Sequence, residues 1–371
     1  GTMTGNIVSG DNVKATYGTG ADLQIYHDSS YSYISDLGTG SLRITSDGAG
    51  VLINKGTSES MGRFLTDGAV ELFYDNAQKF ATTSTGIDVT GNVNGLAITT
   101  TATSNIGLGA NAVDSITTGD YNVGLGDGAG TAITTGVENT SVGYNSLNET
   151  TTGSNNNAFG SETLRRNTTG GNNSAFGHQA LNANTTADNN TAFGWRALLL
   201  NTTGTDNVSV GAYSSDAMTT GTENTVIGTS ALGANTTGAY NTALGRDALR
   251  MNTTAAHNTA VGRKALYTNT TGHNNVASGS GSLLANTTGY YNVAIGSSAM
   301  LSNTTANECV AVGYASLDAN TTGSSNTSVG YGSLGANTTA TNNTAVGKNA
   351  LTANTTGDLN TAVGSLSLDA C

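Results

Sequence analysis

Residues 343–347 read Asn-Thr-Ala-Val-Gly, and the same five residues return at positions 360–364, seventeen residues later. Steps of seventeen residues from Gly364 towards the N-terminus reach a glycine each time, sixteen in all, without an insertion or deletion. These repeat glycines are Gly109, Gly126, Gly143, Gly160, Gly177, Gly194, Gly211, Gly228, Gly245, Gly262, Gly279, Gly296, Gly313, Gly330, Gly347 and Gly364. So strict a period is typical of repeat proteins in which each unit stacks on the previous one.

Each position of the repeat is named by its offset from the repeat glycine. Position −1 is bulky and apolar in fifteen of sixteen copies, position −2 is small, and position −3 is often β-branched. Position +4 is leucine in twelve copies, and position +7 is the asparagine of an Asn-Thr-Thr triplet in eleven. Alternation over positions −3 to −1 predicts a short strand, and seventeen residues are too few for a helical hairpin. The predicted fold is all-β, a β-solenoid or β-roll with one coil per repeat.

The alternation also predicts which side chains share a face. Because successive residues of a strand point to opposite sides, positions −1 and −3 share one face, and position −2 shares the other with the glycine. We expect the bulky face to fill the interior. We expect the small face, which includes Ala260 and Ala345, to lie against a neighbouring chain.

Two further positions make structural predictions. Asparagine recurs at positions −4 and +7, and side chains stacked at a coil spacing of about 4.8 Å are expected to form amide ladders. Position +10 is glycine or alanine, which indicates a need for small size rather than for positive φ. Its four alanines are Ala187, Ala255, Ala306 and Ala340.

Composition narrows the possible functions. Only 10% of the residues are charged and the net charge is −12, so no surface for nucleic acid is expected. Proline is absent, which suits a chain whose backbone N–H groups nearly all donate to neighbouring strands. No run of eighteen apolar residues occurs, so membrane insertion is not expected. Residues 1–5 lack the basic and apolar regions of a signal peptide.

Residues 1–100 differ from the repeats, and we predict a β-rich N-terminal fibre domain there, followed by a solenoid of sixteen repeats over 101–371. Alternation of apolar and polar residues marks strands at 23–26, 42–44, 70–74 and 87–89. The stretch 22–28 also aligns with 69–75, which predicts two related β units.

Residues 20–95 resemble the tail-fibre proteins of marine bacteriophages, cyanophages especially. The motifs that carry the resemblance are Leu23 to Asp28, Tyr33 to Asp36, Leu42 to Ile44 and Met61 to Phe64, followed by Lys79-Phe80. The resemblance implies a structural role in the virion, with no catalytic residues.

The repeats resemble the heads of trimeric autotransporter adhesins, and Asn292-Val-Ala-Ile-Gly296 is the closest match. Those heads form a β-roll with three chains side by side, although their repeats are shorter. Both resemblances imply a homotrimer.

These observations together predict a structural segment of a phage tail fibre, a rigid trimeric rod that serves host attachment as part of the virion. The expected partners are further copies of the chain, neighbouring fibre or tail proteins, and a glycan or receptor on the host surface. The alternative is a bacterial extracellular adhesin or a self-assembling surface filament. No enzymatic activity, cofactor or metal is expected.

Aromatic residues in variable turns are the candidates for surface contacts. Amphipathic rings suit contact with a sugar or receptor, but shielding of the coil edges is the favoured interpretation. The candidates are Tyr144, Trp195, Tyr240, Tyr290, Tyr291, Tyr314 and Tyr331, and Tyr121 stands in a similar turn.

Other motifs have simpler explanations. The Asn-Thr-Thr triplet matches a glycosylation sequence, but its strict position favours a structural ladder. The histidines, among them His257 and His273, lack metal-ligand spacing. Asp28 and Asp36 would suit the acid pair of a glycosidase, but exposed, solvated carboxylates are the favoured interpretation.

The two cysteines, Cys309 and Cys371, stand at positions −4 and +7, more than three coils apart. A separation of about 15 Å or more excludes a disulfide between them within one chain. Residues 365–371 continue the repeat without an atypical capping sequence. We therefore expect a following fibre segment, a cleaved C-terminal domain or another subunit to cover this end.

Overall fold

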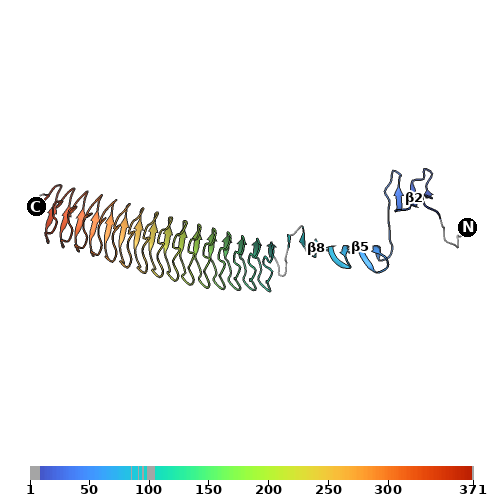
Figure 1. Cartoon of the computed structure of the whole chain (residues 1–371), viewed down its shortest axis with the longest axis horizontal. Coiled ribbons are helices and arrows are strands. Elements are labelled where there is room, and N and C mark those ends of the chain that lie inside the picture. The colour runs from blue at the N-terminus through green and yellow to red at the C-terminus, as the bar shows by residue number, and fades with distance from the viewer. Residues whose placement is uncertain (1–8, 85, 91, 94–95, 98–104, 370–371) are drawn as a thin grey trace. The chain divides into compact units, whose positions relative to one another are not determined.

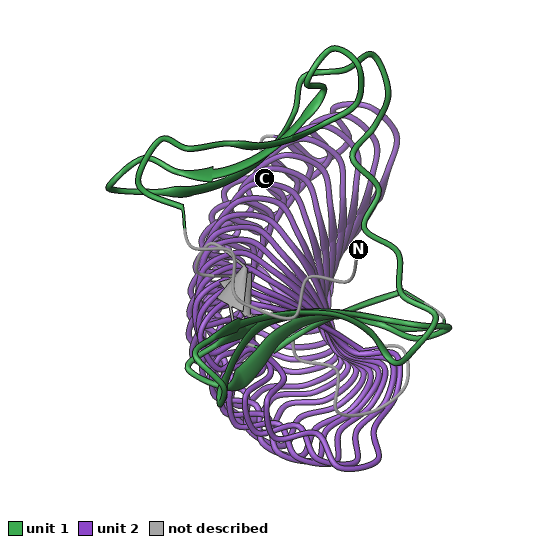
Figure 2. Cartoon of the chain, turned by 90° about the vertical axis from the view of Figure 1, so that its right-hand side faces the viewer, with its two compact units in different colours: residues 1–92 green, residues 93–371 purple. Residues whose placement is uncertain are grey.

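The chain folds into two compact units, residues 1–92 and 93–371 (Figure 2). The computed structural model describes residues 9–84, 86–90, 92–93, 96–97 and 105–369, and no helix occurs among them. The division falls at Asn92, whereas the sequence placed the boundary near residue 100. Residues 1–8 and 98–104 lie outside the described part, as does Cys371.

Unit 1 contains two antiparallel sheets. The first has the order β1-β2-β3, and the second has the order β4-β5-β6-β7-β8. Their strands are β1 (Ala15–Tyr17), β2 (Leu23–His27), β3 (Ser32–Asp36), β4 (Gly50–Lys55), β5 (Glu59–Leu65), β6 (Val70–Tyr74), β7 (Ala77–Thr82) and β8 (Ile87–Val89). β2 and β6 each begin a hairpin, in agreement with the aligned sequences 22–28 and 69–75.

The turns of unit 1 follow from local residue types. Asp75 and Asn76 join β6 to β7, and their φ angles of 49° and 57° suit a two-residue type I′ hairpin turn. The strand predicted at 42–44 is wrong, because this segment pairs with no other strand. Alternation alone cannot stabilise a strand without a partner, and Leu42 and Ile44 are exposed.

Unit 2 is a β-solenoid in which each coil contributes one three-residue strand to a sixteen-stranded parallel sheet (Figure 1). Each strand pairs with the strand seventeen residues later, as in Thr259 opposite Val276, which confirms one coil per repeat. A two-stranded sheet of β9 (Asn92–Val93) and β10 (Leu96–Ala97) precedes it. The solenoid strands are β11 (Ile106–Leu108), β12 (Val123–Leu125), β13 (Thr140–Val142), β14 (Asn157–Phe159), β15 (Ser174–Phe176), β16 (Thr191–Phe193), β17 (Val208–Val210), β18 (Thr225–Ile227), β19 (Thr242–Leu244), β20 (Thr259–Val261), β21 (Val276–Ser278), β22 (Val293–Ile295), β23 (Val310–Val312), β24 (Thr327–Val329), β25 (Thr344–Val346) and β26 (Thr361–Val363).

The repeat glycine turns the chain out of each strand. All sixteen repeat glycines have φ between 125° and 143°, a conformation that side chains disfavour. A β-carbon on Gly262 would also lie 2.6 Å from the carbonyl oxygen of Gly279 in the next coil. Conformation and close backbone approach together explain why this position never varies.

Beyond the glycine, several residues of the coil other than glycine adopt the left-handed backbone conformation, which side chains usually disfavour. Positions +2 and +4 and, farther round the coil, position +12 have positive φ, as in Lys264 (57°), Leu266 (51°) and Asn274 (56°). Hydrogen bonds to the next coil support this path; for example, Leu266 N–H donates to Ser282 O at 3.0 Å. The sequence analysis did not predict these turns.

The predicted assignment of the two strand faces is wrong. Ala260 and Ala345 at position −2 are fully buried inside their own chain, whereas Phe193 and Val346 at position −1 are 56% and 37% exposed. The interior is narrow beside the strand, because position −2 faces position +3 across it. Ser209 and Ser214 show this directly, with their hydroxyl oxygens 2.7 Å apart. Small residues therefore point inwards, and bulky residues form the outer face of the sheet.

Two asparagine ladders run through the interior, as predicted. At position −4, the backbone N–H of Asn139 donates to Oδ1 of Asn122 at 3.0 Å. At position +7, Nδ2 of Asn184 donates to Oδ1 of Asn167 at 2.8 Å. Because Asn167 and Asn184 are fully buried, the Asn-Thr-Thr motif is a structural element and not an accessible glycosylation sequence.

Position +10 is small because both ladders meet its carbonyl group. The carbonyl oxygen of Ala187 accepts Nδ2 of Asn173 at 2.8 Å and Nδ2 of Asn184 at 3.0 Å. Ala187 does not have positive φ, which confirms that size and not backbone handedness is selected at this position.

Candidate functional site

The predicted aromatic residues lie on two turns of the solenoid surface. Tyr144, Trp195, Tyr314 and Tyr331 follow the repeat glycine at position +1, and each is 46–57% exposed. The remaining aromatic residues occupy positions +11 and +12, where Tyr240 and Tyr291 are 48% and 54% exposed.

Most of these rings stack on a ring of the neighbouring coil. The ring centroids of Tyr314 and Tyr331 are 5.4 Å apart with 17° between the ring planes, and those of Tyr240 and His257 are 4.8 Å apart with 5°. His273 stacks on Tyr290 at 5.2 Å. The coil spacing of about 4.8 Å places equivalent rings at stacking distance. Stacked rings cover each other's faces, which favours the interpretation that they shield the coil edges.

Trp195 belongs to a different arrangement. Its Nε1–H donates to Nδ1 of His178 at 3.2 Å, and the Arg196 guanidinium lies 5.4 Å from the centroid of its ring. Its other neighbour is Tyr213, with ring centroids 4.7 Å apart and planes inclined at 57°. Sequence analysis missed Tyr213 because it stands at position +2. Tyr213 follows the aromatic position +1 by one residue, in the coil next to that of Trp195. This closeness could have indicated that the two rings meet.

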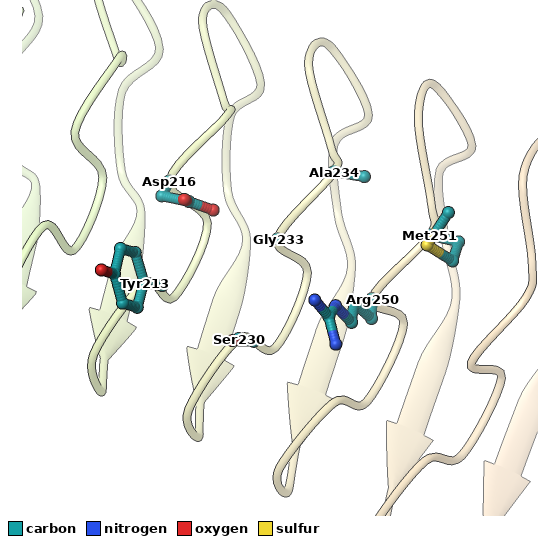
Figure 3. Close-up of a pocket in the computed structure, with 7 residues that line it drawn as sticks. All are labelled: Tyr213, Asp216, Ser230, Gly233, Ala234, Arg250 and Met251. Carbon is teal, nitrogen blue, oxygen red and sulfur yellow. The ribbon is translucent and has the colours of Figure 1, made fainter.

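A hollow of about 490 Å³ opens beside Tyr213 on the side of the coils opposite the strands (Figure 3). It spans three consecutive coils and lies where Gly233 has no side chain. Its lining residues are Tyr213, Asp216, Ser230, Gly233, Ala234, Arg250 and Met251.

Asp216 and Arg250 flank this hollow, because both stand at position +5, one coil before and one coil after Gly233. Arg250 is held by Asp247, whose Oδ1 lies 3.2 Å from its Nη1, and Asp247 also pairs with Arg246 at 3.4 Å. Burial raises the pKa of Asp216, while backbone hydrogen bonds and the charge of Arg250 oppose the rise. The hollow thus has an acceptor at one end and a donor at the other.

The outer face of the sixteen-stranded sheet is a second candidate surface. Position −1 is apolar in fifteen coils, and none of the thirty-two residues at positions −1 and −3 is charged. Phe159 and Phe176 stack at 4.9 Å with 3° between their planes, and Ile227 and Ile295 are 42% and 43% exposed. An exposed apolar surface of this length is typical of a protein interface.

The acidic residues and histidines bear on two candidate sites, a metal site and an acid pair. In the described ranges, no three residues among His, Cys, Asp and Glu are placed to hold a metal ion. Asp28 accepts the N–H of Tyr31 at 2.8 Å and the hydroxyl of Tyr33 at 2.8 Å, and these bonds lower its pKa. A lowered pKa suits an ionised turn cap and not a general acid.

Cys309 interrupts the ladder at position −4. Its N–H donates to Oδ1 of Asn292 at 3.0 Å, and its thiol is free and buried. Burial raises the pKa of Cys309 to about 11, so this thiol is not a nucleophile at neutral pH. Its predicted separation from Cys371 stays a prediction, because Cys371 lies outside the described residues.

Comparison of the chain with family models, with curated proteins and with solved structures gives no match. A search of the described residues for helices long and apolar enough to cross a membrane also finds none. The arguments for function therefore rest on the solenoid fold and on the two surfaces described above.

Proposed function

We propose that the chain is a rigid segment of a bacteriophage tail fibre, located in the virion, that serves host attachment. The observation that supports this most strongly is the uninterrupted parallel sheet of sixteen coils. Fifteen steps of about 4.8 Å make the solenoid about 72 Å long. A stack with two buried asparagine ladders and a continuous core resists bending, which is the property that a spacer between a particle and its target requires.

We further propose that the fibre is a homotrimer whose chains meet through the outer sheet face. This replaces the interface expected from the sequence, because Ala260 and Ala345 are buried within one chain. A partner that covers an apolar strip with a repeat of about 4.8 Å over sixteen coils must itself carry that repeat. A second copy of the chain meets this requirement, and the uncharged face allows identical surfaces to approach each other.

The available area suits a stable contact. A strip about 72 Å long and about 10 Å wide offers about 700 Å² per chain. The three strips of a trimer together amount to about 2,100 Å², which exceeds the total of about 1,600 Å² that a standard two-chain interface buries. Burial at about 25 cal/mol per Å² favours association of apolar area on this scale.

Labelling of virions tests the fibre role. Gold-labelled antibodies against the chain should mark the tail of phage particles in electron micrographs, and the chain should be found among the proteins of purified virions. Labelling of bacterial surfaces in phage-free cultures would instead support the alternative, an extracellular adhesin or surface filament. In that case the fibre assignment is wrong, although the proposed trimer could still hold.

A further inference from the structure

We propose that the hollow beside Gly233 binds one ring of a neutral saccharide. The hollow exists because Gly233 lacks a side chain at position +5, where neighbouring coils carry Asp216 and Arg250. Oδ1 of Asp216 lies 3.5 Å from the place that a β-carbon on Gly233 would take, so the carboxylate oxygen borders the empty volume. Figure 3 shows Asp216 and Arg250 on either side of Gly233.

The spacing of the two charged residues suits a single ring. Asp216 and Arg250 are two coils apart, or about 9.6 Å between equivalent backbone atoms. The hollow of about 490 Å³ opens between these two coils, and both side chains line it. This space suits one sugar ring, whose hydroxyl groups donate to a carboxylate and accept from a guanidinium.

Apolar groups complete the site. Met251 is 43% exposed at the edge of the hollow, and Tyr213 lines it on the coil before Gly233. Trp195, one coil earlier still, packs against Tyr213 at 4.7 Å between ring centroids and restricts its ring. An amphipathic ring beside a hydrogen-bonding pair matches a sugar, which has an apolar face of C–H groups and a polar rim.

The charges in and around the hollow indicate a neutral ligand. Asp216 and Arg250 line the hollow, while Asp247 is paired with both Arg250 and Arg246. The lining of the hollow thus carries one carboxylate and one guanidinium group, so its own charges balance. A charged sugar would find no unbalanced opposite charge to compensate its desolvation.

The chain contains an internal comparison at Gly335. This glycine also stands at position +5, and Oδ1 of Asp318 lies 3.6 Å from the place of its missing β-carbon. The coil on the other side provides Thr352 where the first site has Arg250, and Ala315 stands where the first site has Tyr213. The second place therefore lacks both the guanidinium donor and the ring, and we expect no binding there.

A role for this saccharide site in host attachment rests on the proposed function. Binding itself is tested with the purified full chain, so its result is independent of virion labelling. Methionine methyl groups labelled with carbon-13 are suitable NMR reporters. Met251 lines the hollow, while Met218 and Met300 are fully buried. The probes are methyl glucopyranoside, methyl galactopyranoside and galacturonic acid.

In the wild-type chain, one or both neutral pyranosides should shift the Met251 signal, with saturation in the millimolar range. The Met218 and Met300 signals should not move. Gly233→Leu should weaken binding at least tenfold by filling the hollow. This variant should fold, because position +5 is leucine at Leu199, Leu284 and Leu301. The matched control Gly335→Leu should bind as the wild type does.

Three results would overturn the proposal. The first is a Met251 signal that neither neutral pyranoside moves. The second is a shift that survives in Gly233→Leu while the Met218 signal shows an intact fold. The third is a response to galacturonic acid alone, which would contradict the neutral ligand.

Arg250→Gln should bind the neutral pyranosides at least threefold more weakly. This variant leaves the hollow open, so its effect reports hydrogen bonding by the guanidinium and not filling of the hollow.

Discussion

Ser215 and Met218 reverse the usual order of side-chain sizes in a coil. Ser215 is small where most coils have leucine, and Met218 is large where most coils have asparagine. Ser215 stands at position +4 and Met218 at position +7, and both are fully buried. Gly130 and Ile133 make the same exchange, with the Ile133 Cδ1 atom 2.9 Å from the place that a β-carbon on Gly130 would take. Positions +4 and +7 of a coil therefore fill one shared interior volume.

The exchange leaves two buried polar atoms without a hydrogen bond, Oγ of Ser215 and Oδ1 of Asn201. The double substitution Ser215→Leu with Met218→Asn should remove the first and give the second a ladder donor. We expect the double variant to be more stable than the wild type by about 1–3 kcal/mol in urea denaturation.

The single substitutions provide the controls. Ser215→Leu alone should overpack the core against Met218 and cost about 1–3 kcal/mol. Met218→Asn alone should leave a cavity beside Ser215 and also lower the stability. A double variant less stable than both single variants would contradict the shared volume.

A second prediction compares two glycines of the same coil region. Gly262→Ala should destabilise the chain by at least about 3 kcal/mol, because residue 262 has φ of 131° and its β-carbon would meet the Gly279 carbonyl. Gly272→Ala should cost less than Gly262→Ala, because residue 272 does not have positive φ and other coils have Ala255 and Ala306 at that position. A β-carbon on Gly272 also meets the carbonyl oxygen of Gly289, so the backbone must shift to the path of the alanine coils and the cost is not zero. Thermal unfolding followed by circular dichroism measures both. Equal effects would show that the repeat glycine is not the constrained position.

Much of the solenoid is predictable from the sequence because stacking repeats each constraint sixteen times. The strand at positions −3 to −1, both asparagine ladders and the need for a small residue at +10 all follow from columns of residues. The inward face does not follow from the strand pattern alone. A signal for it was present, since the serine at −2 is matched by another serine five residues later in each case. These pairs are Ser141 with Ser146, Ser209 with Ser214 and Ser328 with Ser333.

Other features could not be predicted from residue types. Leucine is disfavoured at positive φ, yet Leu164 has φ of 49° because hydrogen bonds to the next coil hold it there. The hollow beside Gly233 depends on one glycine at a variable position between Asp216 and Arg250. Only the alignment of three coils in space shows that these residues lie together.

Cys309 should make the wild-type chain sensitive to alkaline pH. Its pKa is about 11 in the folded chain, above the ordinary value of 9.0, so the folded state holds the proton more tightly than the unfolded state. Stability should therefore be unaffected below pH 9 and fall between pH 9 and about pH 11. Cys309→Asn should lack this fall and also restore the ladder between Asn292 and Asn326, with a gain of about 1 kcal/mol. Unfolding midpoints of the two chains across this pH range provide the test, and parallel curves would contradict the assignment.

A charge on the outer sheet face should prevent assembly. Ile295→Lys places an ammonium group within the apolar strip, and we expect it to shift the proposed trimer towards monomer. The control is Ser297→Lys, an exposed residue of the following turn. Light scattering at micromolar concentration reports the mass of each. If both variants keep the mass of the wild type, the chains meet elsewhere.

Electron cryomicroscopy of the full chain tests the central claim most directly, because it shows both the stacking of coils and the number of chains. The account predicts a straight segment about 72 Å long, with coils repeating every 4.8 Å or so and three chains in contact through their outer sheet faces. Single solenoids with that apolar face open to solvent, at concentrations where the sample is monodisperse, would contradict it.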